Sequence, residues 1–183
     1  MIVRPAGTDD LAALAALARQ TYADAFGHSF SPSDLAAHLE RSLADSYFRQ
    51  AMAEDVFLLA EAAGRLADFV QFGPVRIAIA AASPQDQELR RIYVLGEFQN
   101  RGIGHRLMDA ALDHPRLKAA DIYLDVWEQN HSAAALRTLR LRSHRRPQPR
   151  DRLGNRSGSG PDHGTAAVPN YTLVCLFIAL PRC

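Results

Sequence analysis

Apolar side chains follow a helical pattern in the first third of the chain. They recur every three or four positions between Leu11 and Phe26, which predicts an amphipathic helix with one buried stripe. Two acidic residues directly before this stripe suit the positive end of a helix dipole, and a glycine follows it. A second helix is predicted from the capping sequence Ser31-Pro32-Ser33-Asp34 to about Met52.

The pattern then changes to short apolar runs, which predict strands. Residues 55–61 and 66–72 read as a hairpin around a turn at 63–65. Residues 88–95 give the strongest strand signal of the chain. The other predicted elements are a first strand at 1–5, a strand at 77–81, a helix at 102–113, a strand at 122–127, a helix at 132–140 and a strand at 171–180.

Charge divides the chain into two parts. Residues 1–136 hold 12 basic and 18 acidic side chains, a net charge of −6, whereas residues 137–183 hold 9 Arg and 2 Asp, a net +7. Eight of these arginines lie between Arg137 and Arg156, among Pro, Gly, Ser and Asn. This composition predicts an acidic folded body with a basic segment that has no regular apolar pattern.

The segment with readable chemistry follows the strand at 88–95. Gln99, Gly102 and Gly104 form a Q-x-x-G-x-G turn that leads into the helix at 102–113. Glycines allow a backbone to approach a phosphate closely, and a helix N-terminus adds N–H groups and positive potential. A Gly-x-Gly turn can also be ordinary helix capping, so the turn alone leaves both interpretations open.

The context of the turn resembles the GNAT superfamily of N-acetyltransferases, whose pyrophosphate loop is written Q/R-x-x-G-x-G/A. A narrower similarity, to bacterial spermidine/spermine-type N-acetyltransferases, is carried by the segments RRIYVLGEFQNRGIG and LDVWEQN. The resemblance implies an α/β fold in which a mixed, mostly antiparallel sheet carries helices on both faces. It also implies acetyl-CoA as cosubstrate and a small primary amine, with a polyamine first, as acceptor.

The resemblance assigns roles to particular residues. The fourth strand would pair with the pantetheine arm, and the turn would hold the pyrophosphate, with an Asn after the fifth strand in support. These cofactor-binding positions are Ile92, Tyr93, Val94, Gln99, Asn100, Arg101, Gly102, Ile103, Gly104 and Asn130. Asn130 could equally cap the helix that begins near Ser132.

Glu88 is the candidate catalytic residue. In the family, a carboxylate eleven residues before the loop Gln often acts as base toward the amine, and this offset falls on Glu88. The chemistry needs such a group, because an ammonium must lose a proton before its nitrogen can attack a thioester. Glu88 could instead be a structural carboxylate paired with Arg90 or Arg65.

The resemblance ends near residue 136. The family expects a Tyr near 137 and a Gly-Phe pair near 141–142, where this chain has Arg137, Leu141 and Arg142. One hypothesis is a reading-frame change near codons 133–136, because the shifted codons permit Tyr, Gly and Phe in that order. The alternative is a native, divergent basic tail. We therefore predict a GNAT domain at 1–136, a disordered segment at 137–170 and a strand within 171–183, with C-terminal strands atypical or missing and catalysis impaired.

The remaining expectations concern partners and location. Without an apolar run long enough for a membrane helix or a signal sequence, a cytoplasmic protein with no membrane partner is expected. The two cysteines have no metal-ligand spacing, so no metal site is predicted. A homodimer is one option for the assembly. The alternative function is a non-catalytic CoA-binding module whose basic tail contacts RNA, although the tail lacks interleaved aromatic residues.

Overall fold

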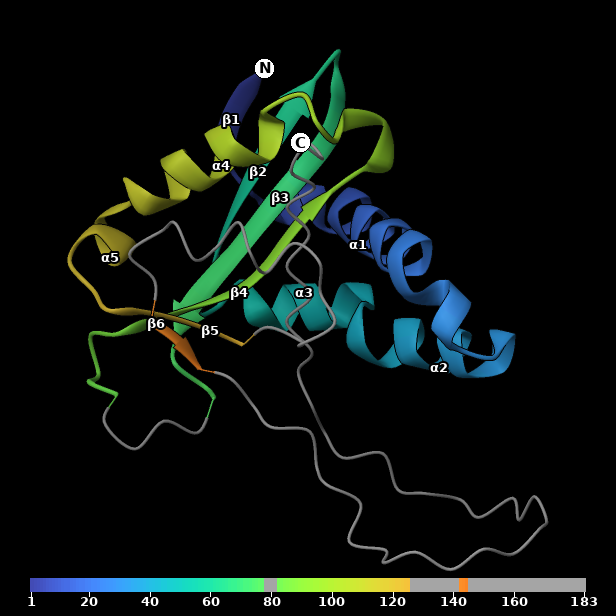
Figure 1. Ribbon diagram of the computed structural model, residues 1–183, viewed down its shortest axis with the longest axis horizontal. Helices are drawn as coiled ribbons and strands as arrows, with labels where there is room; N and C mark the ends of the chain where they lie inside the picture. Colours follow the sequence, from blue (N-terminus) through green and yellow to red (C-terminus); the bar gives the residue numbers. More distant parts are fainter. Residues whose placement is uncertain (78–81, 126–141, 145–183) are drawn as a thin grey trace, which may run out of the picture.

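Within the described residues, 1–77, 82–125 and 142–144, the computed structural model is built around one sheet of six strands. The strands are β1 (Ile2–Pro5), β2 (Val56–Ala62), β3 (Arg65–Pro74), β4 (Gln87–Val94), β5 (Ile122–Asp125) and β6 (Arg142–His144). They lie in the sheet in the order of the sequence, from β1 at one edge to β6 at the other (Figure 1).

The directions of the strands follow from how they are connected. A tight turn with positive φ angles at Ala63 (51°) and Gly64 (72°) joins β2 to β3, so these strands form the predicted hairpin. The first four strands pair with one another in antiparallel fashion. Two helices separate β4 from β5, and such a crossover makes the pair parallel. β6 is parallel to β5. The prediction of a mixed, mostly antiparallel sheet is confirmed.

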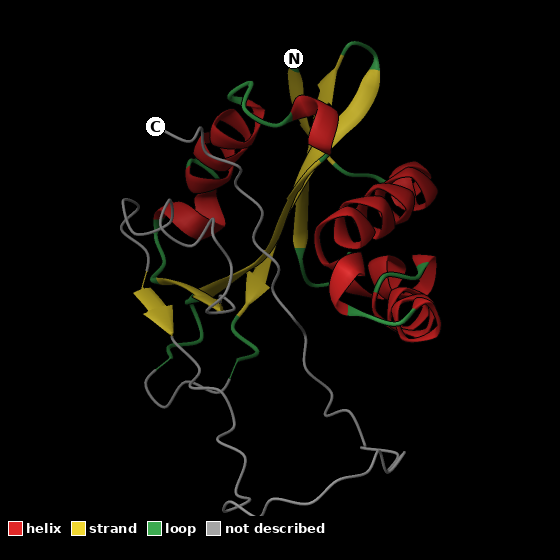
Figure 2. Cartoon of the chain, turned by 45° about the vertical axis from the view of Figure 1, so that its right-hand side comes forward, coloured by secondary structure: helices red, strands yellow, loops and turns green. Residues whose placement is uncertain are grey.

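Helices cover both faces of the sheet, as predicted (Figures 1 and 2). One face carries α1, α2 and α3, and the other carries α4 and α5. The helices are α1 (Leu11–Phe26), α2 (Pro32–Ser42), α3 (Asp45–Ala51), α4 (Ile103–Leu112) and α5 (Pro115–Lys118), with 3-10 turns η1 (Thr8–Asp10), η2 (Gly27–Ser29) and η3 (Gly96–Phe98).

The second predicted helix is in fact two helices. Its start is confirmed, because Oγ of Ser31 accepts a hydrogen bond from the Asp34 amide at 3.2 Å. Its continuity to Met52 was wrong, since Leu43 (φ −132°) and Ala44 (ψ 156°) leave the helical region between α2 and α3. Leu43 is buried in the core. The burial of this large apolar side chain therefore offsets the helical hydrogen bonds that are lost at the break.

The core has one layer on each side of the sheet. Rings from α3, β2, β3 and β4 pack edge to face on the side of α1 to α3, namely Phe48, Phe57, Phe69 and Tyr93. On the other side, α4 buries Ile103, Leu107 and Met108. Each such side chain contributes roughly 1.5–3 kcal/mol on burial. Together the two layers hold the C-terminal end of β4 and the start of α4 in place.

Several predicted elements lie outside the described residues. These are most of the strand at 77–81, the end of the strand at 122–127, the helix at 132–140 and the strand at 171–180. The boundaries of the predicted domains therefore stay predictions.

Candidate active site

The turn between β4 and α4 has the backbone geometry of an anion-binding site. Asn100 (φ 59°) and Gly102 (φ 72°) both adopt left-handed conformations, and Gly102 is the N-cap residue of α4. No side chain caps the helix there, which leaves its first N–H groups available. A small depression at this turn is lined by Val94, Phe98, Gln99, Asn100, Gly102, Ile103, Gly104 and His105.

The two glycines of the turn serve different purposes. Gly102 supplies the positive φ, and no atom lies within 4 Å of the position that a Cβ would take. Gly104 instead allows the first turn of α4 to approach the sheet closely. A Cβ on Gly104 would lie 3.2 Å from Cγ2 of Val94 and 3.6 Å from Oδ2 of Asp68. The first turn of α4 therefore rests directly on β3 and β4.

The side chain of Gln99 has a contact that the sequence did not predict. Its Nε2 donates a hydrogen bond to the carbonyl oxygen of Val94 at 3.1 Å. This bond ties the turn to the end of β4. The other predicted cofactor positions differ in exposure, since Arg101 is exposed whereas Ile92, Tyr93 and Ile103 are buried.

β4 and β5 separate after Glu88, and the part of β4 beyond this point leads into the turn. Their pairing covers only Gln87 with Ile122 and Glu88 with Tyr123. From Leu124 onward, the described part of β5 pairs with β6 alone. Between Leu89 and Val94, β4 therefore has no described strand partner on its β5 side, and its backbone groups there can pair with an extended ligand.

Glu88 lies where the two strands begin to separate, and its side chain is 1% exposed. Its Oε2 accepts hydrogen bonds from the amides of Arg76 at 2.7 Å and Ile77 at 3.2 Å. The same oxygen lies 2.7 Å from Nη1 of Arg90. The pairing with Arg90 is the one that the structural interpretation of Glu88 expects. Within the described residues, Oε2 makes all of these contacts, and none involves Oε1.

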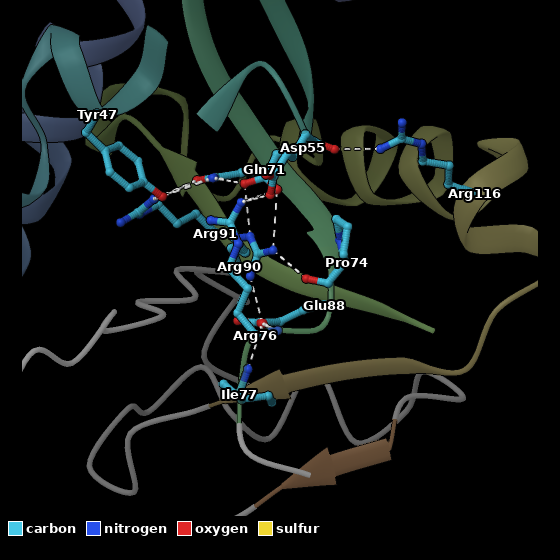
Figure 3. Close-up of polar contacts among 11 residues, drawn as sticks. Tyr47, Asp55, Gln71, Pro74, Arg76, Ile77, Glu88, Arg90, Arg91 and Arg116 are labelled. Carbon is cyan, nitrogen blue, oxygen red and sulfur yellow. Dashed lines mark hydrogen bonds and ion pairs between the residues drawn. The ribbon is translucent and has the colours of Figure 1, made fainter. Parts of the chain in front are cut away.

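Glu88 belongs to a buried polar network that connects α3 with three strands or strand ends (Figure 3). Gln71 pairs with Arg91 and Phe72 with Leu89, so Arg90 is the extra residue of a β-bulge. Nε of Arg90 lies 2.9 Å from Oδ2 of Asp55, and its guanidinium also donates to the carbonyl of Pro74. Arg90 thus bridges two buried carboxylates.

A second part of the network surrounds Arg91, which is 3% exposed. Its Nη1 donates to Oε1 of Gln71 at 2.6 Å and to the hydroxyl of Tyr47 on α3. Burial lowers the pKa of Arg91, but the contacts with Tyr47 and Tyr93 outweigh it and raise the pKa above its ordinary value. Arg91 therefore remains charged in the core.

The sequence analysis missed this network. Its members other than Glu88 are Tyr47, Asp55, Gln71, Arg76, Arg90 and Arg91. A signal was present, since two adjacent arginines in the strongest predicted strand must point to opposite faces unless a bulge intervenes. Asn130 lies outside the described residues.

Residues 16–138 match the model of the acetyltransferase (GNAT) family. The chain belongs to this family. An uncharacterised N-acetyltransferase encoded in the pepI 3′ region of Lactobacillus delbrueckii subsp. lactis is 30% identical to this GNAT chain over 127 residues, 68% of this chain and 73% of the relative. The predicted enzyme class, an acetyl-CoA-dependent N-acetyltransferase, is thereby confirmed.

Solved structures share the fold of this GNAT chain. The PaiA N-acetyltransferase of Thermoplasma acidophilum, in complex with coenzyme A, has a TM-score of 0.62 and 20% identity, over 75% of this chain and 86% of its own. A GNAT family acetyltransferase of Brucella melitensis, in complex with acetyl-CoA, has a TM-score of 0.54 and 21% identity, over 73% of this chain and 80% of its own.

Two further observations concern the described part of this GNAT chain. None of its helices is long and apolar enough to cross a membrane. It also contains no group of three or more His, Cys, Asp or Glu side chains placed to hold a metal ion.

Proposed function

We propose that this GNAT chain transfers the acetyl group of acetyl-CoA to a primary amine of a small molecule, and that the amine is a polyamine. The separation of β4 from β5 after Glu88, along the part of β4 that leads into the turn at 99–104, carries the proposal. An extended arm can pair with the edge of β4 that has no strand partner among the described residues, while its pyrophosphate meets the N-terminus of α4. The residues present therefore fit the cosubstrate of the family.

The candidate cofactor residues divide by their position. Backbone groups of Ile92, Tyr93 and Val94 would pair with the pantetheine arm along the edge of β4 that faces β5. The turn from Gln99 to Gly104 would surround the pyrophosphate, with Asn100 and Gly102 turning its N–H groups outward and the exposed Arg101 adding positive charge. Asn130 keeps its predicted role beside the cofactor.

Glu88 is the proposed base. The two amides and Arg90 hold its Oε2, which fixes the orientation of the carboxylate and leaves Oε1 to accept a proton from the amine. With the cosubstrate bound, the neutral amine nitrogen would form a bond to the acetyl carbon as the C–S bond breaks, and the proton that this nitrogen then loses would end on the departing CoA thiolate. The same contacts fit the alternative, in which Glu88 only orders Arg90. The pH dependence of the rate separates the two.

The charge of the body favours a cationic acceptor. Residues 1–136 carry a net −6, which attracts a polyamine at long range without specifying one. The alternatives within the same reaction class are a protein N-terminus and the amine of an antibiotic. We place the reaction in the cytoplasm, and a homodimer remains the candidate assembly. An RNA-binding module without catalysis is not favoured by the family assignment.

The test is an acetyl-transfer assay that follows release of the CoA thiol. Spermidine, an aminoglycoside and a peptide with a free N-terminus would be compared at equal concentration. We expect the largest kcat/KM with spermidine. A larger value for either of the other amines would reject the polyamine while leaving the acetyltransferase assignment in place.

A further inference from the structure

Asp68 is a buried acid directly beneath the proposed cofactor turn. It lies on β3, opposite Ala60 of β2 and Val94 of β4, and is 0% exposed. Its Oδ2 is 3.6 Å from the Cβ position of Gly104, in the first turn of α4. This carboxyl group therefore lies in the sheet, in the layer next to the turn that would hold the pyrophosphate.

Among the described residues, neither oxygen of this carboxyl group has a hydrogen-bond partner. The amide of Phe69 attracts it without reaching hydrogen-bond geometry. Burial therefore dominates and raises the pKa of Asp68 well above its usual range. An ionised carboxylate without a partner is very costly in such a place, so the group holds a proton at neutral pH.

Other charged groups on the surrounding elements are directed away from Asp68. On β2, Glu61 is bound by Arg4 at 2.8 Å. On β4, Glu88 and Arg91 belong to the polar network on the other face of the sheet. In the turn, Glu97 is exposed and paired with the exposed Arg65 of β3 at 3.0 Å. The remaining titratable or charged side chains of the turn and of α4 up to its last turn are also exposed to solvent, namely Arg101, His105, Arg106 and Asp109. Asp68 thus titrates in an apolar layer.

We infer that Asp68 is a positioning residue for the cofactor turn: its neutral carboxyl group supports the first turn of α4, and loss of its proton weakens acetyl-CoA binding. This inference rests on the proposed binding of pyrophosphate at the turn. An ionised Asp68 would place a negative charge behind the N–H groups that face the phosphates, at short range and in a medium of low polarity. By reciprocity, bound acetyl-CoA would make Asp68 hold its proton more tightly.

The experiment measures the Kd of acetyl-CoA by titration calorimetry from pH 5.5 to 9.5. The chain is compared with Asp68→Asn and Asp68→Ala, which cannot ionise, and with Asp109→Asn, which removes an exposed carboxylate from α4. A phosphate monoester of the ligand itself titrates near pH 6. The informative quantity is therefore the ratio of the Kd of the chain to that of each variant at the same pH.

We expect the ratio to Asp68→Asn to stay constant at low pH and to rise by roughly tenfold at the alkaline end. The ratio to Asp109→Asn should stay nearly flat. The Asp68 carboxyl ¹³C resonance should titrate at higher pH when acetyl-CoA is bound. If acetyl-CoA binds but the ratio to both Asp68 variants is independent of pH, the role of Asp68 is rejected alone. If the chain binds no acetyl-CoA at any pH, the proposed function is rejected with it.

Discussion

A Cβ atom on Gly73 would lie 2.1 Å from Oδ1 of Asp55. Asp55 cannot retreat without loss, because its carboxylate is bound by Arg90 and Gln71 inside the core. We predict that Gly73→Ala lowers the free energy of unfolding by about 3 kcal/mol or more, since it combines overpacking with disruption of a buried ion pair. Urea denaturation at neutral pH measures the change.

Gly96→Ala is the matched control for this substitution. No atom lies within 4 Å of its Cβ position, and its φ is not positive. The free energy of unfolding should change by less than about 1 kcal/mol. Equal effects of the two substitutions would mean that Gly73 does not limit the position of Asp55.

The cofactor turn should not tolerate a negative side chain at Gly102. Gly102→Asp places a carboxylate at the N-terminus of α4, where the pyrophosphate is proposed to bind, so affinity for acetyl-CoA should fall by at least about tenfold. Gly64→Asp is the control, because Gly64 has the same φ of 72° in the β2–β3 turn and also an open Cβ position. Calorimetry on both variants separates backbone strain from loss of binding. Undiminished affinity in Gly102→Asp contradicts the assignment of the turn.

The base role of Glu88 predicts a particular pH dependence. Glu88→Gln should reduce kcat/KM by roughly 10²–10⁴-fold at neutral pH and by less at high pH, where more of the amine is already deprotonated. A pH–rate profile with the best acceptor checks this. A uniform reduction across pH, or none, would return Glu88 to a structural role.

The ion pair between Asp10 and Arg4 leads us to predict that the free energy of unfolding falls in acid. The hydrogen bond from Arg4 lowers the pKa of Asp10 to about 2, below its value of about 3.9 in an unfolded chain. The ionised group therefore stabilises the fold above pH 4, and this contribution disappears as pH falls toward 2. Because Arg4 is 38% exposed, it amounts to about 1 kcal/mol or less. Asp10→Asn should show a shallower decline in unfolding free energy between pH 5 and 2, and an identical decline would refute the assignment.

The basic C-terminal sequence leads to a further prediction. Arg137 stands where the family expects a Tyr that protonates the leaving thiolate, and a guanidinium does not release a proton at neutral pH. A version with the reading frame restored at codons 133–136 should therefore turn over faster, by roughly 10²–10⁴-fold, and melt at a higher temperature. Equal turnover and equal melting temperatures would show that the arginine-rich ending is native.

Local signals in the sequence were sufficient for the turn and for most elements. The glycines at 102 and 104 and the strand before them identify the turn, because its geometry depends on residues close in sequence. The polar network was not predictable in this way. Asp55 and Arg90 are 35 positions apart, and their contact exists only after β3 and β4 pair with a bulge. The burial of Asp68 has the same origin, since Ala67 is unpaired where β2 and β3 shift register.

The bulge at Arg90 makes the two halves of β4 follow opposite alternations. Downstream of it, Arg91 pairs with Gln71, and upstream of it, Leu89 pairs with Phe72 and Glu88 with Gly73. Glu88 and Arg91 are three positions apart, yet the extra residue puts them on the same face. If β4 kept Arg90 but had no bulge, simple alternation would turn Leu89 toward the polar network and Glu88 toward the apolar layer under α4 and α5. The number of residues in β4, as much as their type, therefore determines which side chains at the start of this strand face the polar network.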